Sequence, residues 1–308
     1  MIELKTLHND GKCAPKVHYA CMEDLSALIP AEFVAKRYNR KMYLMFNAVK
    51  PEILEDLESF CQHAMIDSGI FQLLYKGTKS NIHKERRIIR PESFYINYQN
   101  EYIKYIKSLP VKFVVVECDV QAVAGQEIAW KLRRELYDKL DNRIISVWHR
   151  CDGIEGMQKL LEFTDYLGIA YHTDGSTADD VKTAVKYAYS HKKPNQDIHI
   201  LGTADTKFIN SVRYKAGSMV TSVDASNWMR FLKGGMTRHY KTKWPMLRKN
   251  IATDSGQYAE IMDFVNYKID IWKRRGIEIH SNPAYIAAEC VFLLSEYQKN
   301  NTQIGLQY

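Results

Sequence analysis

The feature that most constrains the fold is a regular alternation of short apolar runs with longer amphipathic segments. Runs rich in β-branched or aromatic residues, which are typical of strands, lie at 42–48, 64–67, 112–119, 143–149, 166–171, 197–202 and 219–224. Amphipathic segments of helical length lie between most of them, at 51–61, 125–140, 153–163, 177–191 and 206–216. This alternation predicts an α/β protein whose parallel sheet is covered by helices.

The predicted sheet is either open and doubly wound or closed into a (β/α)8 TIM barrel. The apolar runs give seven strands, whereas a closed (β/α)8 barrel needs eight. Weaker apolar runs near 17–21 and 276–280 are the two candidates for the eighth strand. We favour the barrel, as one domain over residues 1–308, because neither a linker nor a compositional break divides the chain. We expect residues 236–308 to form a C-terminal helical elaboration in which 282–299 is a closing helix.

A long connection between the second and third predicted strands departs from the short loops expected elsewhere. Residues 73–100 are basic and rich in turn residues, and they include Arg86, Arg87 and Arg90. Long excursions at one end of a barrel are usually lids or binding loops. We therefore expect a basic lid inserted after the second predicted strand.

The charge distribution favours a polyanionic partner. The 308 residues carry a formal net charge of +7, and Lys and Arg cluster at 84–90, 131–134, 238–249 and 273–275, often beside aromatic residues. Solvated helix faces are the alternative explanation for each cluster. No run approaches the ~20 apolar residues that cross a bilayer, and the first residues lack the apolar core of a secretory signal. We therefore expect a cytoplasmic protein without membrane contact.

Metal and cofactor signatures are missing from the sequence. The six cysteines form no CxxC pair, and His149, His172 and His199 lie near strand ends without the spacing of metal ligands. Neither of the two common glycine-rich phosphate loops occurs. We therefore expect no metal site and no cofactor.

Acidic residues follow several of the predicted strands. Asp67, Asp119 and Asp224 stand where the second, third and last predicted strands end, and His149 ends the fourth. In a parallel barrel these ends form the rim of the active site. Clustered acids repel one another, which favours a functional role, although an Asp after a strand is also a common helix N-cap. Carboxylates without a metal suit chemistry at an anomeric carbon, and the basic, aromatic surface suggests N-glycosidic chemistry on a nucleic acid with a flipped base.

The segment after the second predicted strand resembles a known motif. Residues 67–72 read DSGIFQ, which is similar to the DSGGFQ or DSGGYQ motif of the tRNA-guanine transglycosylases. Shorter resemblances follow in the same order within roughly residues 60–235: ECD at 117–119, GIA at 168–170, LGTAD at 201–205, VD at 223–224, and Arg230. The (β/α)8 barrel of that family agrees with the fold predicted from periodicity.

The resemblance implies a role for each matching residue. Asp224 would attack C1′ of the target nucleoside and hold a covalent glycosyl-enzyme intermediate, and Asp67 would protonate departing guanine and deprotonate the incoming base. Asp119 would read the amidine edge of the base. The other implied substrate-binding residues are Ser68, Phe71 as a stacking partner, Gln72, His149 in place of the family's usual Gln, Gly168, Ile169 and Gly202. The implied nucleic-acid contacts are Arg230 and the lid residues Arg86, Arg87 and Arg90.

The sequence differs from the family's pattern in two places, and these differences indicate which branch of the family it resembles. The family's C-terminal CxCxxC…His zinc site is absent after Asp224, where Cys290 is the only cysteine and the histidines are His239 and His280, and Ile70 replaces the second glycine of the motif. This pattern is most similar to the DpdA-type DNA transglycosylases of phages and bacterial modification islands. We therefore expect exchange of guanine in DNA for a 7-deazaguanine base of the preQ0 type, in the host cytoplasm if the chain is phage-encoded. A tRNA acceptor, or a catalytically silent nucleic-acid-binding subunit, is the alternative, and the sequence leaves a homodimer open.

Overall fold

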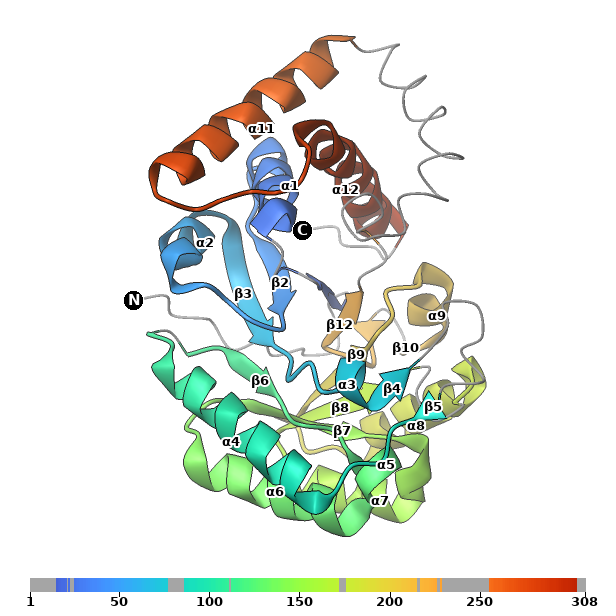
Figure 1. The fold of residues 1–308 in the computed structure, drawn as a ribbon. Helices are drawn as coiled ribbons and strands as arrows, with labels where there is room; N and C mark the ends of the chain where they lie inside the picture. The colour runs from blue at the N-terminus through green and yellow to red at the C-terminus, as the bar shows by residue number, and fades with distance from the viewer. Residues whose placement is uncertain are drawn as a thin grey trace. The chain divides into compact units, whose positions relative to one another are not determined.

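The described chain folds as a closed α/β barrel. The computed structural model describes residues 15–20, 22, 25–76, 86–110, 112–171, 176–214, 217–225, 228 and 255–303. Eight of the described strands close the barrel in the order β1-β12-β9-β8-β7-β6-β3-β2 (Figure 1). Parallel pairing runs without interruption from β3 through β6, β7, β8 and β9 to β12. The predicted α/β class and the closed barrel are therefore both confirmed.

Seven of the barrel strands are those predicted from the apolar runs. The barrel strands are β1 (Lys16–Tyr19), β2 (Met42–Phe46), β3 (Cys61–Ile66), β6 (Val114–Val116), β7 (Ile144–Trp148), β8 (Tyr166–Ala170), β9 (Asp197–Leu201) and β12 (Ser222–Ala225). The eighth strand is β1, because residues 276–280 form no strand. Two short antiparallel pairs lie outside the barrel, namely β4 (Tyr75–Lys76) with β5 (Arg86–Arg87), and β10 (Arg213–Tyr214) with β11 (Gly217–Ser218).

Helices alternate with the barrel strands. Those described are α1 (Leu25–Tyr38), η1 (Pro51–Ile53), α2 (Leu54–Phe60), α3 (Phe71–Leu74), α4 (Glu92–Ser108), α5 (Gln121–Ala124), α6 (Gln126–Lys139), η3 (Arg150–Asp152), α7 (Gly153–Phe163), α8 (Ala178–His191), α9 (Thr206–Ser211), α11 (Ser255–Arg274) and α12 (Pro283–Gln303). Local sequence sets their ends. At the start of α8, Thr177 Oγ1 accepts from the Asp180 N–H at 3.2 Å, and the Asp180 carboxylate accepts from the Thr177 N–H at 2.8 Å. This reciprocal capping box explains why the helix begins there.

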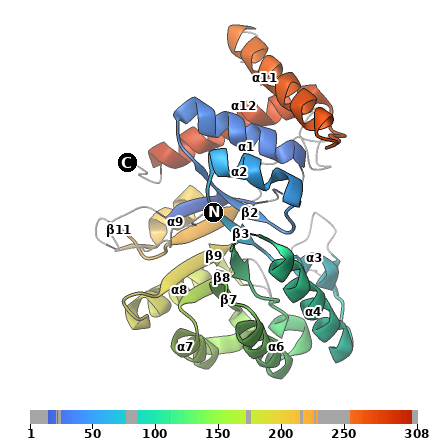
Figure 2. The same cartoon turned by 90° about the vertical axis from the view of Figure 1, so that its left-hand side faces the viewer.

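The first of two compact units comprises residues 1–18 and 63–225 and holds most of the barrel. Figure 2 shows α4, α6, α7 and α8 covering the outer face of its parallel strands. Side chains on both faces of these strands are buried, as a parallel sheet requires. A Cβ added at Gly168 in β8 would lie 2.8 Å from Ile145 Cγ2 and 2.9 Å from Leu201 Cδ1, so any larger residue there would force these side chains in β7 and β9 to shift.

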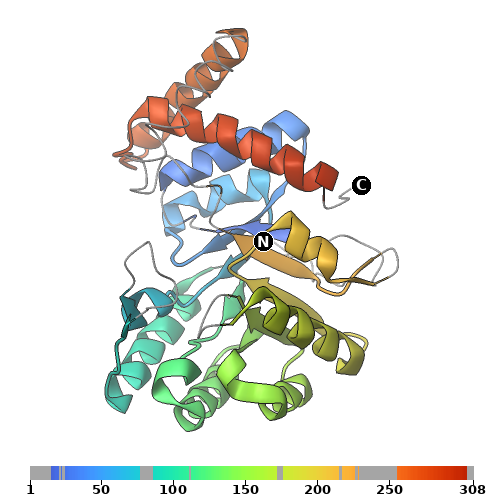
Figure 3. The ribbon, with the colours of Figure 1, turned by 90° about the vertical axis from the view of Figure 1, so that its right-hand side faces the viewer.

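The second compact unit comprises residues 19–62 and 226–308. Within it, α1 packs along α12 and contacts α11 (Figure 3). Lys268 Nζ lies 2.7 Å from Glu32 Oε2, and this buried ion pair joins α11 to α1. The predicted closing helix at 282–299 is confirmed as α12, whereas residues 236–254 and 304–308 of the predicted elaboration lie outside the described part. None of the helices in the described ranges is both long and apolar enough to cross a membrane.

The basic lid predicted at 73–100 is not confirmed. Residues 92–100 belong to α4, whose Tyr102 hydroxyl donates to the backbone oxygens of Ile66 and Val116, each at 3.0 Å. These bonds tie α4 to β3 and β6, so this helix is part of the barrel wall. Pro91 stands at the N-cap of α4, where it marks the start of the helix. Residues 77–85 lie outside the described part.

Candidate active site

Three aspartates lie at the carboxyl ends of barrel strands, as the sequence predicts. Asp67 directly follows β3, Asp119 stands shortly after β6, and Asp224 lies near the end of β12. Parallel strands bring these ends to one rim of the barrel. Asp67 and Asp119 are half-buried, and Asp224 is buried.

The three carboxylates interact electrostatically. The pKa of Asp67 is raised from 3.8 to about 7. Burial is the largest cause, followed by the negative charges of Asp119 and Asp224, while the backbone N–H groups of Ser68 and Gly69 act in the opposite direction. Repulsion of this kind requires the carboxylates to lie near one another. The structure therefore brings the three predicted acids together, and Asp67 is partly protonated near neutral pH.

Asp119 is bonded to the predicted base-binding histidine. His149 Nε2 lies 2.9 Å from Asp119 Oδ2, and because an ionised carboxylate can only accept, the imidazole N–H donates. The His149 side chain is only 1% exposed, and its backbone N–H donates to Asp152 Oδ2 at 2.7 Å. The ring is therefore placed to orient Asp119, and a direct contact between His149 and a base stays a prediction.

Asp224 accepts two hydrogen bonds at one oxygen. Oδ1 lies 3.2 Å from His199 Nε2 and 2.9 Å from the backbone nitrogen of Gly202. Gly202 has a φ of 86°, a conformation that glycine adopts without strain, and this turn aims its N–H at the carboxylate. On the other edge of the imidazole, His199 Nδ1 lies 2.7 Å from Ser222 Oγ, which lies 2.6 Å from the Tyr166 hydroxyl. Burial raises the pKa of Tyr166, so this hydroxyl keeps its proton.

Two further histidines lie beside His199, and sequence reasoning missed both. His18 Nε2 and His63 Nδ1 are 3.0 Å apart, and the His18 and His199 ring centroids are 5.9 Å apart. Burial lowers the pKa of His63 to about 4, with Arg143 and His199 acting in the same direction, and burial also lowers the pKa of His18. Both rings are therefore neutral at neutral pH. Within the described ranges, no group of three or more His, Cys, Asp or Glu side chains is arranged to hold a metal ion.

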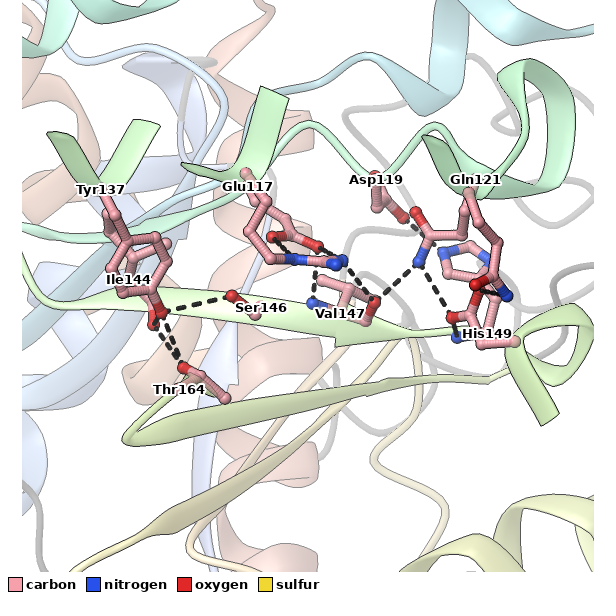
Figure 4. Close-up of polar contacts among 12 residues, drawn as sticks. Glu117, Asp119, Gln121, Tyr137, Ile144, Ser146, Val147, His149 and Thr164 are labelled. Carbon is pink, nitrogen blue, oxygen red and sulfur yellow. Dashed lines mark hydrogen bonds and ion pairs between the residues drawn. The ribbon is translucent and has the colours of Figure 1, made fainter. Parts of the chain in front are cut away.

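A buried ion pair supports the strand ends that carry Asp119 and His149 (Figure 4). Arg133 of α6 donates to Glu117 twice, from Nε to Oε2 at 2.7 Å and from Nη2 to Oε1 at 2.6 Å. Glu117 Oε1 also accepts from the Val147 N–H at 2.9 Å. Glu117 stands two residues before Asp119, and Val147 stands two residues before His149. The ion pair therefore fixes the ends of β6 and β7, where the chain leaves the barrel towards these two side chains.

Replacing Arg133 by Met is expected to destabilise the fold by about 3–5 kcal/mol, because Glu117 would stay buried without its cation. The double variant with Glu117→Gln should recover most of that loss, since the amide oxygen can still accept from the Val147 N–H. Lys131→Met is the control on the same helix, because its ion pair with Glu92 is exposed and contributes little. Urea unfolding measures all three, and equal losses for Arg133→Met and Lys131→Met would contradict the expectation.

The DSGIFQ segment turns the chain from β3 into α3. Ile70 is fully buried, which explains a large apolar residue where the family motif has glycine. Ser68 is buried, and its backbone oxygen accepts from the Tyr98 hydroxyl at 2.5 Å. Phe71 is 36% exposed at the start of α3, which is compatible with its predicted stacking role. The side chain of Gln72 lies outside the described part.

The other predicted contacts fall in three groups. Gly168 and Ile169 lie within β8, and the Ile169 side chain is fully buried, so only its backbone is available for a predicted contact. Arg90 is exposed, with Cζ 5.4 Å from the Phe94 ring centroid. Arg230 lies outside the described residues, and so do the side chains of Arg86 and Arg87.

Comparison with known proteins adds no family assignment. A scan against protein-family models finds no match, and a search of curated proteins finds none either. The described geometry itself defines a class, namely an α/β barrel with three interacting carboxylates at the carboxyl ends of its strands. The likeness to the transglycosylase motif stays a prediction from the sequence.

Proposed function

We propose that this protein is a DNA-guanine transglycosylase that exchanges guanine in DNA for a 7-deazaguanine base of the preQ0 type. The observation that carries the proposal is a division among the three carboxylates. Asp119 and Asp224 each accept an imidazole N–H, whereas Asp67 has a pKa of about 7. Base exchange needs a nucleophile, a group that both gives and takes a proton, and a group that recognises the base. The proposed chemistry uses no zinc and no cofactor.

Asp224 is assigned as the nucleophile of the first half-reaction. Its Oδ1 is held by His199 and Gly202, which leaves Oδ2 to bond the sugar. As the Oδ2–C1′ bond forms, the C1′–N9 bond breaks and its electron pair passes to guanine N9. Asp67 supplies the proton to the departing base. The product is neutral guanine and a glycosyl ester on Asp224.

The second half-reaction uses Asp67 in the opposite direction. The carboxylate left by the first step takes the N9 proton of the incoming 7-deazaguanine. N9 then bonds C1′, the Oδ2–C1′ bond breaks, and its electron pair returns to Asp224. A group with a pKa of about 7 is populated in both protonation states at neutral pH, so it suits both steps.

Asp119 is assigned to recognition of the base. The buried His149 ring orients its carboxylate through the bond to Oδ2. A carboxylate facing N1–H and the exocyclic amine favours guanine-like bases, because any other base would leave a desolvated acid unpaired. The same edge is present in guanine and in the incoming 7-deazaguanine, so one carboxylate serves both half-reactions.

The choice of DNA rests on the sequence. The C-terminal zinc motif of the tRNA enzymes is missing after Asp224, and the net charge of +7 suits a phosphate backbone. Arg230, Arg86, Arg87 and Arg90 are the proposed phosphate contacts. A guanine in duplex DNA must leave the base stack to reach the three carboxylates, as in other enzymes that act on bases.

Mass spectrometry of nucleosides tests the reaction and the acceptor together. The protein is incubated with duplex DNA, single-stranded DNA or tRNA and a preQ0-type base, and each nucleic acid is then digested. The proposal expects the 7-deazaguanine deoxynucleoside from DNA, together with released guanine, and neither from Asp224→Asn. Labelling of tRNA alone would move the assignment to the tRNA enzymes. Binding without exchange on any substrate would indicate a silent nucleic-acid-binding subunit.

A further inference from the structure

Asp224 is held at one oxygen by two donors that come from the end of β9. Oδ1 accepts from His199 Nε2 at 3.2 Å and from the Gly202 N–H at 2.9 Å, and within the described part no hydrogen bond falls on Oδ2. In a glycosyl ester formed through Oδ2, Oδ1 becomes the carbonyl oxygen. It regains negative charge when the ester is cleaved, so both donors stand where charge develops in the second half-reaction.

We propose that His199 is a positioning residue that sets the rate of the second half-reaction by donating to Oδ1 as the negative charge returns. This inference rests on the function proposed above. In the step concerned, N9 of the incoming base bonds C1′ while the Oδ2–C1′ bond breaks and its electron pair returns to Asp224. His199 donates a hydrogen bond throughout and transfers no proton.

The neighbours of His199 fix the orientation of its ring. An ionised carboxylate can only accept, so Nε2 carries the hydrogen that points to Asp224. Nδ1 is bonded to Ser222, which is in turn bonded to Tyr166, and all three side chains are fully buried. The ring is therefore held from both edges, as an orienting group behind a reactive side chain should be.

Packing alone is the competing role for His199. The ring is fully buried and lies edge-on to Tyr166 and His18, with centroid distances of 6.3 Å and 5.9 Å. Leucine would fill a similar volume at this position but would remove the Nε2 hydrogen-bond donor. Glutamine would keep a donor near the place of Nε2. The pair His199→Leu and His199→Gln therefore separates packing from hydrogen bonding.

The donor stabilises the carboxylate anion more than the neutral ester, because hydrogen bonds to charged acceptors are stronger. Its loss raises the free energy of ionised Asp224 relative to the ester, which slows ester cleavage and does not slow ester formation. In His199→Leu we expect adduct breakdown to fall about 100-fold and adduct formation to keep at least its wild-type rate, so the adduct accumulates. His199→Gln should keep both rates within about tenfold of the wild-type rates.

Two single-turnover measurements test this inference. Formation is followed as the protein–DNA adduct that survives denaturation after mixing with guanine-containing DNA. Breakdown is followed as loss of that adduct after addition of a preQ0-type base. Equal losses of both rates in His199→Leu, or equal behaviour of His199→Leu and His199→Gln, would overturn the inference and leave packing as the role of the ring.

A second variant covers the case in which His199→Leu does not fold. Ser222→Ala removes the bond to Nδ1 and leaves the carboxylate untouched, so it should slow adduct breakdown selectively, by about tenfold. Unchanged breakdown in Ser222→Ala together with parallel losses in the His199 variants would reject the inference. Absence of any adduct with the wild-type protein is a different result, because it would reject the proposed function itself and the inference with it.

Discussion

Asparagine in place of Asp224 is expected to abolish the covalent intermediate and to leave DNA binding intact. The neutral amide is a poor nucleophile, so the rate of adduct formation should fall by about 10⁴-fold or more. The amide oxygen can still accept from His199 and from the Gly202 N–H, so the local structure should persist. The measurement is the yield of protein–DNA adduct after denaturation, beside a binding assay on the same DNA.

The matched control for Asp224→Asn is Asp205→Asn. Asp205 is an exposed N-cap of α9 whose Oδ1 accepts from the Phe208 N–H at 2.8 Å, and asparagine caps helices about as well. This variant should form the adduct at the wild-type rate. A full adduct yield in Asp224→Asn, or an equal loss in both variants, would contradict the assignment of the nucleophile.

The Asp67→Asn protein is expected to lose guanine release by about 10²- to 10⁴-fold, because the amide cannot protonate the leaving base. In the wild-type protein, adduct formation needs protonated Asp67, so its rate should fall as the pH rises through about 7. Adduct breakdown needs the Asp67 carboxylate, so its rate should fall as the pH drops, with a midpoint below that of adduct formation, because esterified Asp224 carries no charge that raises the pKa of Asp67. Single-turnover rates across this range should therefore change in opposite directions, and parallel pH profiles would contradict the two roles of Asp67.

The stability of Asp67→Asn gives an independent check on the same pKa. Folding raises the pKa of Asp67 from 3.8 to about 7, so the contribution of the protonated side chain to stability is lost as the pH rises through that interval. The asparagine side chain of Asp67→Asn does not ionise, so the variant does not lose stability in this way as the pH rises. Relative to the wild-type protein, the variant should therefore gain more stability at about pH 8 than at about pH 5. A stability difference that does not vary with pH would mean that the acids do not interact as described.

The barrel strands were predictable because they are short, nearly continuous apolar runs. Strands buried on both faces, such as β7 and β8, give a strong signal of this kind, and both lie within the predicted ranges. β1 gave a weaker signal because it spans only Lys16–Tyr19 and includes the buried His18. The strand-end aspartates were predictable for the same reason, since a polar residue that follows an apolar run is visible in the sequence.

Two long helices, α1 and α4, were not predicted, for different reasons. α1 is buried along Leu25–Ala35 and carries Pro30 inside it, so it shows neither an amphipathic period nor an uninterrupted helical pattern. α4 does have an apolar stripe, but the turn residues before it suggested a loop. Its buried Tyr95 and Tyr102 carry polar groups that find partners only in the folded structure. In both cases tertiary packing decided the structure.

The histidines of the candidate site were the least predictable part. His18, His63 and His199 come from β1, β3 and β9, and nothing in their spacing along the chain indicates that they meet. A single buried histidine in a strand is usually a core residue whose polar atoms are satisfied locally. The link between His199 and Asp224 depends on the register that pairs Ser222 with His199 across β12 and β9.

The most direct test of the central claim is to locate the covalent bond. The wild-type protein is reacted with guanine-containing DNA, denatured, and digested with nuclease and protease, and the modified peptide is sequenced by mass spectrometry. The account predicts a deoxyribosyl adduct on the side chain of Asp224. A sugar found on any other residue, or base exchange that proceeds without a covalent adduct, would contradict it.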